Sequence, residues 1–279
     1  MRAGGDPGYE HTLAGPVTLR GIALHSGRPA EMRLRPAPEG TGIRFRRTDT
    51  EGPPIPATLD MVTGSTSCVA LGGPRGVRMV EHLLSAAWAL GVDNLEVEVS
   101  GEELPGLDGS ALPIVQAIRQ AGLRPQGLPR RLLRVRAPCW VEEGEGCVVA
   151  LPSGRFAVTC VVTVGPPGPG DMAATYDPDR ESYEETIAPA RTWGYERDAE
   201  ALWARGLALG ASLDNTLVVG GSGYLNPPRF SNEPARHKVV DLLGDLALLG
   251  SRIAGVFVAV RAGHGLHIAL ARALQAQGG

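Results

Sequence analysis

The chain has 279 residues, of which 43% are hydrophobic and 20% charged, and its formal net charge at pH 7 is −3. This composition is typical of a globular protein that can bury a substantial core, and it excludes a largely disordered chain. The small negative charge gives no reason to expect nucleic acid or an anionic membrane surface as a partner.

No apolar run approaches the roughly 20 residues that a membrane-spanning helix needs. Even the run over residues 253–260 is far shorter than that. The first seven residues lack the apolar core of a signal peptide. We therefore expect a cytoplasmic protein without an integral membrane span. We also expect it to be a monomer that acts on a small molecule.

The first half of the chain has the pattern of a strand meander followed by two helices that flank a further strand. Glycine and proline turns separate the strands, and apolar residues recur at helical spacing from Leu83 to Leu90. The expected elements are strands over 16–24, 30–36, 42–47 and 94–99, and helices over 81–90 and 111–121.

The second half repeats this order of elements without repeating the sequence. The expected elements are strands over 132–137, 146–151, 156–163 and 253–260, a helix over 235–249, a loop over 262–265 and a helix through 274. The repetition predicts an α+β fold of two similar domains, 1–127 and 128–279, each a mainly antiparallel sheet packed on helices, with the active site in the inter-domain cleft. A turn-rich loop over 165–170, within an insert around 165–185, and the segment 186–212 have no counterpart in the first half.

Three side chains form a candidate metal site. His237 and Asp241 are four residues apart on the expected second-half helix, so they share one face and can hold one cation between them. His82 starts the corresponding helix of the first half. Two histidines and one aspartate suit a catalytic zinc ion, because such sites use three protein ligands and leave a fourth position for water. A lone histidine is more often structural, so the combination is what favours a metal-dependent hydrolase.

Glu81 stands directly before His82. Adjacent helical side chains point about 100° apart, but at a helix start both can reach a site placed over the N-terminus. Glu81 would then be a general base that takes a proton from the attacking water. The alternative is a glutamate that only offsets the helix dipole.

His264 is flanked by two glycines, which allow a ligand to approach the backbone closely. Its imidazolium can stabilise a developing oxyanion or protonate a leaving amine, and Asp245 can orient it. The alternative for Asp245 is a solvated acid on a helix face. Lys238 either meets an anionic group of the substrate or is simply exposed.

These residues fall within short sequence motifs that occur in the same order in a known protein family. The motifs are GIALHSG at 21–27, VEHLLSA at 80–86, GVDN at 91–94, LDGSA at 107–111, ARTWG at 190–194, LDN at 213–215, RHKVVDLLGDL at 236–246 and GH at 263–264. In these motifs the chain resembles the zinc-dependent UDP-3-O-acyl-N-acetylglucosamine deacetylases, which commit the pathway to lipid A. The resemblance extends from about residue 12 to the last helix.

The resemblance implies hydrolysis of the N-acetyl group of UDP-3-O-acyl-N-acetylglucosamine, with release of acetate. It also implies one zinc ion per chain, for which Fe(II) can compete. In that reaction Thr192 would hydrogen-bond the oxyanion and Lys238 would help to hold the nucleotide diphosphate. The implied metal ligands are His82, His237 and Asp241, the implied catalytic residues are Glu81, His264, Thr192 and Asp245, and the implied substrate contacts are Lys238, Trp193, Asp198, Arg261 and Gly210.

Some positions depart from the family pattern. Trp193 stands where phenylalanine is usual, Arg261 where lysine is common, and residues 165–170 and 265–267 also differ. These departures leave the metal set intact but bear on the nucleotide contacts and the acyl-chain preference. Two alternatives stay open, a paralogous zinc deacetylase that acts on another acylated amino sugar and a non-catalytic homologue that binds a sugar nucleotide or lipid.

Overall fold

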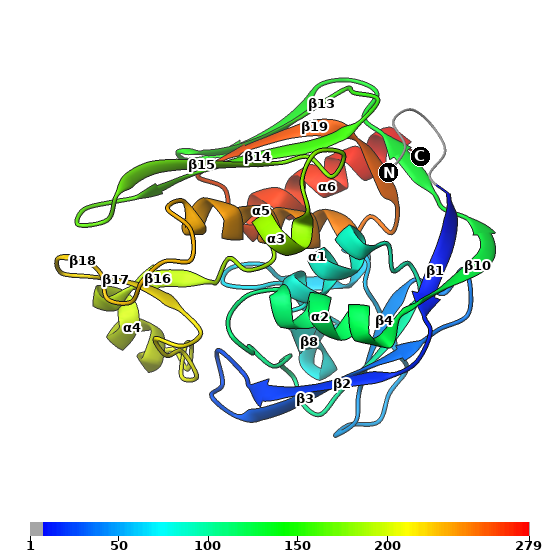
Figure 1. The fold of residues 1–279 in the computed structure, drawn as a ribbon, viewed down its shortest axis with the longest axis horizontal. Helices are drawn as coiled ribbons and strands as arrows, with labels where there is room; N and C mark the ends of the chain where they lie inside the picture. Colours follow the sequence, from blue (N-terminus) through cyan, green and yellow to red (C-terminus); the bar gives the residue numbers. More distant parts are fainter. Residues whose placement is uncertain (1–7, 279) are drawn as a thin grey trace.

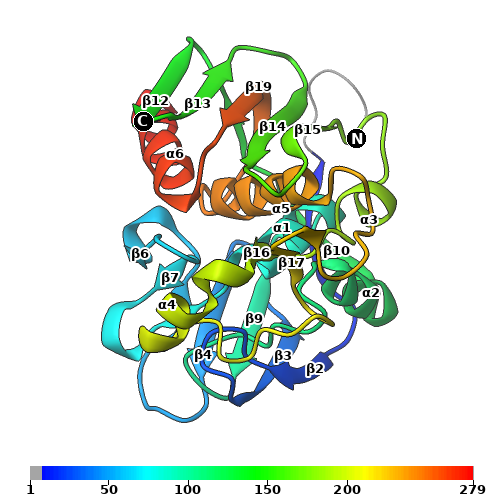
Figure 2. The same cartoon turned by 90° about the vertical axis from the view of Figure 1, so that its left-hand side faces the viewer.

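The computed structural model describes residues 8–278. The seven-residue start that shows no signal-peptide core in the sequence lies outside these residues. None of the helices within the described range combines the length and the apolar character needed to cross a bilayer. Two sheets form the outer layers of the molecule, and helices fill the space between them (Figure 1, Figure 2).

The first half builds a five-stranded sheet in the order β2-β3-β9-β4-β5. Its neighbouring strands are antiparallel except for β4 and β9. Alternate residues of β9 are buried, so one face of this strand packs on the helices. The bounds are β2 (Val17–Ile22), β3 (Pro29–Pro36), β4 (Ile43–Arg47), β5 (Ile55–Pro56), α1 (Glu81–Leu90), β9 (Leu95–Val99) and α2 (Leu112–Ala121).

The second half builds a sheet in the order β12-β13-β19-β14-β15, and β11 pairs with one end of β19. Its pairs are antiparallel except β14–β19 and β11–β19. Helix α5 packs on β14 and β15, and α6 packs on β12 and β13. The bounds are β11 (Leu132–Arg134), β12 (Cys139–Glu143), β13 (Gly146–Leu151), β14 (Phe156–Val164), β15 (Gly170–Tyr176), α5 (Glu233–Ala247), β19 (Arg252–Val260) and α6 (His264–Gly278).

Three small sheets and several short helices complete the chain. The pair β1-β10 lies at one side of the molecule, beside the large sheets (Figure 1). The sheet β6-β7-β8 precedes α1, and β16-β17-β18 belongs to the segment between β15 and α5. The bounds are β1 (Tyr9–Leu13), η1 (Leu59–Met61), β6 (Val62–Gly64), β7 (Ala70–Leu71), η2 (Gly73–Arg75), β8 (Val77–Arg78), β10 (Leu123–Pro129), α3 (Tyr183–Thr186), β16 (Trp193–Tyr195), η3 (Glu196–Asp198), α4 (Ala199–Ala204), β17 (Leu217–Gly220) and β18 (Gly223–Tyr224).

The two halves meet where α1 packs against α5. Gly244 of α5 makes this approach possible, because a Cβ atom at this position would lie only 2.1 Å from the carbonyl oxygen of Glu81. The close crossing sets the first turn of α1 against the middle of α5. Helices α1 and α5 carry half of the expected site residues, including all three expected metal ligands.

The structure confirms an α+β fold with mainly antiparallel sheets packed on helices. Helix α5 begins at Glu233 rather than at residue 235, with Pro234 in its first turn, a position that proline tolerates well. Helix α6 begins at His264, which therefore lies at a helix N-terminus and not in the expected loop. Residues 165–169 form the turn that joins β14 to β15, and Gly170 is already the first residue of β15. Strand β10 runs through residue 127, and the domain division at 127/128 stays a prediction.

Candidate active site

The three expected metal ligands lie together at the α1–α5 contact. One ligand atom from each of His82, His237 and Asp241 lies within 4.8 Å of the others, and all three residues are buried. The two imidazole rings meet edge to face with centroids 5.0 Å apart. The Nε2 atom of His237 lies 3.4 Å from Oδ1 of Asp241. The i,i+4 spacing on α5 thus gives the shared face that the sequence predicts.

The protonation of this cluster suits a divalent cation. Burial lowers the pKa of His82 to about 3 and also lowers the pKa of His237, so both rings are neutral near pH 7. Burial alone would raise the pKa of the Asp241 carboxyl, but the Lys238 ammonium is the largest opposing charge and the pKa stays well below its usual range. Two neutral imidazoles and one carboxylate are a donor set that divalent metal ions take in catalytic sites.

A contact from the segment before β16 orients His237. Its Nδ1 atom lies 3.1 Å from the carbonyl oxygen of Ala190, which places the ring proton on Nδ1 and leaves Nε2 free for a metal. The next residue, Arg191, donates from Nε to the Glu233 carboxylate over 2.9 Å, and both side chains are buried. This pair fixes the segment against the start of α5.

Glu81 is the first residue of α1 and is almost completely buried. Its Oε2 atom accepts a hydrogen bond of 3.1 Å from the backbone N–H of Val69. Burial raises the pKa of Glu81 to about 7, against the opposing charge of His264. A carboxyl group with a pKa near neutrality is matched to accepting and releasing a proton at physiological pH. The helix-dipole alternative does not require such burial.

His264 and Asp245 form a buried pair. The Nδ1 atom of His264 lies 2.8 Å from Oδ2 of Asp245. Burial disfavours the imidazolium, but Asp245 and Asp241 outweigh it and raise the pKa of His264 to about 10. The pKa of Asp245 is lowered despite its burial, chiefly by His264. A protonated imidazole held by its Nδ1–H can present its other ring proton to a reacting atom.

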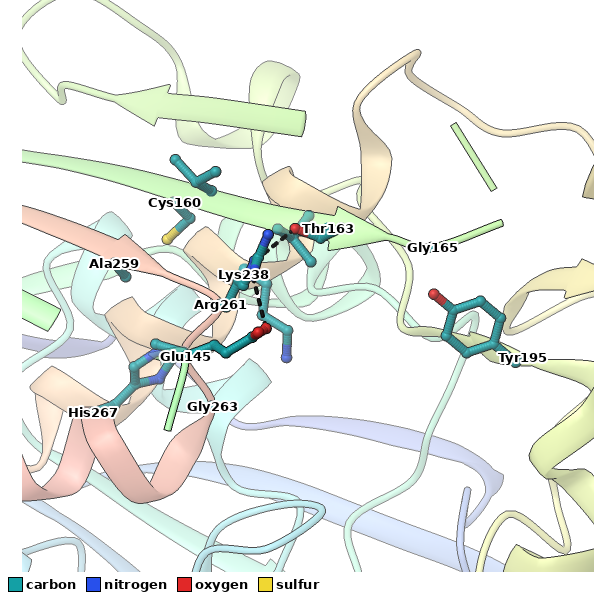
Figure 3. A pocket seen from close by; sticks show the side chains of 13 residues that line it. Glu145, Cys160, Thr163, Gly165, Tyr195, Lys238, Ala259, Arg261, Gly263 and His267 are labelled. Atoms are coloured by element: carbon teal, nitrogen blue, oxygen red, sulfur yellow. Dashed lines mark hydrogen bonds and ion pairs between the residues drawn. The ribbon is translucent and has the colours of Figure 1, made fainter. Parts of the chain in front are cut away.

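A cavity of about 640 Å³ is lined by the C-terminal ends of β14 and β19, by the first turn of α6 and by Lys238 of α5 (Figure 3). Lys238 and Arg261 bring two cations to its wall. Lys238 is partly buried, and its Nζ atom lies 2.8 Å from Oδ2 of Asp241. Arg261 donates to the hydroxyl of Thr163 over 2.9 Å and pairs with Glu145 over 2.7 Å. Lys238 is therefore not a solvated surface charge, whereas the side chain of Arg261 is 41% exposed.

The remaining residues expected at the site come from the segment between β15 and α5. Thr192 follows the Arg191 anchor, and its backbone N–H donates to the carbonyl oxygen of Gly109 over 2.8 Å. Trp193 begins β16 and meets the Tyr195 ring edge to face. Asp198 is exposed and precedes α4 without capping it.

Gly210 has a structural reason of its own. Its N–H donates to the carbonyl oxygen of Leu24, and an added Cβ would lie 2.3 Å from the carbonyl oxygen of Ala23. The glycine therefore lets this segment close onto the loop before β3. No contact among the described residues links Gly210 to the metal cluster.

His267 belongs to the site but was not among the expected site residues. It lies on the cavity wall and its Nδ1 atom is 2.8 Å from Oδ2 of Asp245. The signal was present in the sequence, because residues three apart on a helix share a face and His264 precedes His267 by three. Placing residue 264 in a loop concealed that spacing.

Known proteins match this chain over nearly its full length. A sequence profile of the LpxC family, UDP-3-O-acyl N-acetylglycosamine deacetylase, matches residues 10–276. A UDP-3-O-acyl-N-acetylglucosamine deacetylase of Thermosynechococcus vestitus is 41% identical over 273 residues, covering 96% of this chain and 94% of that protein. A protein of the same name from Nostoc sp. is 41% identical over 276 residues, covering 96% and 98%. One from Anaeromyxobacter sp. is 41% identical over 274 residues, covering 97% and 90%. The chain therefore belongs to the UDP-3-O-acyl N-acetylglycosamine deacetylase family.

Proposed function

We propose that this chain is a zinc-dependent deacetylase that hydrolyses the N-acetyl group of UDP-3-O-acyl-N-acetylglucosamine. The products are UDP-3-O-acyl-glucosamine and acetate, and the step would commit its substrate to lipid A. One observation carries the proposal. Three potential metal ligands lie buried near Glu81, whose pKa is about 7, and near His264, which is protonated at neutral pH. The family membership and the printed names of the relatives support the same activity. A cytoplasmic, monomeric protein stays a prediction.

His82, His237 and Asp241 would hold the metal ion. A bound zinc ion supplies Lewis acidity, which polarises an amide carbonyl and makes water more acidic. The described residues fit that ion because their donor atoms converge, are buried and have the required protonation states. Zinc is our choice because two imidazoles and one carboxylate are typical of catalytic zinc.

The chain's own groups supply the proton transfers. Glu81 would take a proton from the water that attacks the acetyl carbonyl, since its pKa of about 7 leaves a large share of the carboxylate free near neutrality. His264, held at Nδ1 by Asp245, would donate its other ring proton to the departing amine. Thr192 would donate a hydrogen bond to the oxyanion. The ion pair between Arg191 and Glu233 would hold the Thr192 backbone in place.

The cavity beside the metal cluster would take the nucleotide diphosphate. Lys238 and Arg261 line it and can meet phosphate oxygens. Trp193, Asp198 and Gly210 would contact the substrate from the segment between β15 and α5, as the resemblance implies. Arg261 already pairs with Glu145, so this contact would have to rearrange or be shared when a phosphate binds.

An acetate-release assay tests the activity. Purified protein with one equivalent of zinc would be incubated with UDP-3-O-acyl-N-acetylglucosamine beside its Glu81→Ala variant. We expect turnover that falls by about 10²–10⁴-fold in the variant. Stoichiometric zinc without turnover in the unaltered protein would contradict the substrate assignment and favour another acylated amino sugar or a binding role.

A further inference from the structure

Two histidines donate to one oxygen of Asp245. The Nδ1 atoms of His264 and His267 each lie 2.8 Å from Oδ2 of this carboxylate. The two rings stand nearly perpendicular, with an interplanar angle of 79° and centroids 6.0 Å apart. Both nitrogens must carry hydrogen to make these bonds, because an ionised carboxylate only accepts. The three residues are thus a hydrogen-bonded unit.

The unit is deeply buried, and packing alone does not explain an imidazole at residue 267. His267 is 0% exposed and Asp245 is 1% exposed. The Nε2 atom of His267 and the Oδ1 atom of Asp245 have no hydrogen-bond partner among the described residues. An apolar side chain would fill this position on α6 without leaving a buried nitrogen unsatisfied. The cost of keeping an imidazole here points to a role in the site.

We propose that His267 is a positioning residue for His264, acting through Asp245. Its Nδ1–H occupies one lone pair of Oδ2 and holds the carboxylate in the orientation that receives His264. The same N–H also draws electron density from that oxygen, which weakens the hydrogen bond that Asp245 accepts from His264. His264 is then both correctly aimed and a stronger acid toward the departing amine. The proposal rests on the proposed function for its kinetic part and on the geometry alone for its hydrogen-bond part.

The charge around His264 defines what His267 can change. The ionisable groups that face His264 are Asp241, Asp245 and His237 on α5, Glu81 and His82 on α1, and His267 on its own helix. Two carboxylates of α5 and the carboxyl of Glu81 favour the imidazolium. His267 is the group that shares the Asp245 oxygen, so its removal strengthens the hold of that carboxylate on the His264 proton.

A matched pair of variants tests the proposal in the zinc-loaded protein. His267→Asn keeps an N–H donor close to the position of Nδ1, whereas His267→Leu has a similar shape without the donor. We expect His267→Leu to lower kcat by about 10-fold or more, in line with the loss of a charge-assisted hydrogen bond, with KM within about 2-fold. We expect His267→Asn to retain kcat within about 3-fold. The alkaline limb of the kcat profile should move to higher pH in the leucine variant only.

Proton NMR gives a readout that does not require turnover. The Nδ1–H of His264 should give a low-field signal, identified by its loss in His264→Gln. It should move to lower field in His267→Leu, because the remaining bond to Asp245 strengthens, and stay in place in His267→Asn. If the leucine variant does not fold, His267→Gln replaces it, since its amide reaches the Nε2 position instead of Nδ1.

The outcomes separate the two proposals. An unaltered His264 signal and unaltered kcat in His267→Leu would overturn the positioning role. Equal loss of kcat in the asparagine and leucine variants, with an unmoved alkaline limb, would also overturn it and indicate packing. If the unaltered protein shows no turnover while the NMR signals respond as expected, the positioning geometry stands and the proposed function fails.

Discussion

The ammonium of Lys238 lies 2.8 Å from the Oδ2 atom of Asp241, on the same helix and within the site. The other carboxylate oxygen of Asp241 faces His237. One carboxylate therefore joins the metal cluster to the wall of the cavity. A substrate phosphate bound at Lys238 would compete with Asp241 for the N–H donors of the ammonium group. Under the proposed function, metal binding and nucleotide binding would therefore be linked through this contact.

Replacing Lys238 should therefore weaken substrate binding. We expect Lys238→Ala to raise KM by about 10-fold or more, the typical cost of a charged hydrogen bond to phosphate. We expect Lys238→Arg to be milder, since it keeps the charge but changes the donor geometry. Steady-state kinetics with the UDP-linked substrate measures both. An unchanged KM in the alanine variant would place the diphosphate elsewhere.

Activity should depend on pH with two limbs. Glu81 must be deprotonated to accept a proton, so activity falls as pH drops below its pKa of about 7. His264 must be protonated to donate, so activity falls as pH rises past its pKa of about 10. A bound cation adds positive charge and moves both limbs to lower pH. A kcat/KM profile between pH 5 and 10 checks this, and an acid limb that persists in Glu81→Gln would assign it to another group.

The sequence predicts the separate parts of the His82, His237 and Asp241 cluster because each part is set by local geometry. The i,i+4 step from His237 to Asp241 and the position of Glu81 and His82 at a helix start are set by helical geometry alone. What joins the parts is not local. Gly244 shows no helix-crossing role in the sequence, and only the structure sets it against the Glu81 carbonyl.

Other features depend on contacts that no local pattern reveals. Arg261 has a positive φ of 49°, a conformation that residues other than glycine rarely adopt. Its N–H donates to the carbonyl oxygen of Val161, and its side chain contacts Thr163 and Glu145. Two-residue strands such as β7 are too short to be predicted from the sequence, and they form by pairing with neighbouring strands. The sequence does not predict strand β15, because the segment has few β-branched residues.

Gly244→Ala should separate α1 from α5. A methyl group 2.1 Å from a backbone carbonyl oxygen cannot be accommodated without moving one helix. We expect a loss of about 1–3 kcal/mol in the free energy of unfolding, as for an overpacked core, together with weaker metal binding. Gly154→Ala is the matched control, since a Cβ there meets nothing within 4 Å. Chemical denaturation and elemental analysis measure both effects, and equal stability of the two variants would show that the helices can shift freely.

Removing a metal ligand and removing the acid should have different consequences. We expect His237→Ala to lose bound zinc, because it leaves a two-residue donor set, and to lose activity with it. We expect His264→Ala to keep zinc near one equivalent while turnover falls by about 10²–10⁴-fold, because His264 serves proton transfer and not the ion. Elemental analysis after dialysis separates the two variants. Zinc loss in His264→Ala would mean that His264 and Asp245 help to bind the ion. It would contradict the assignment of His82, His237 and Asp241 as the ligands.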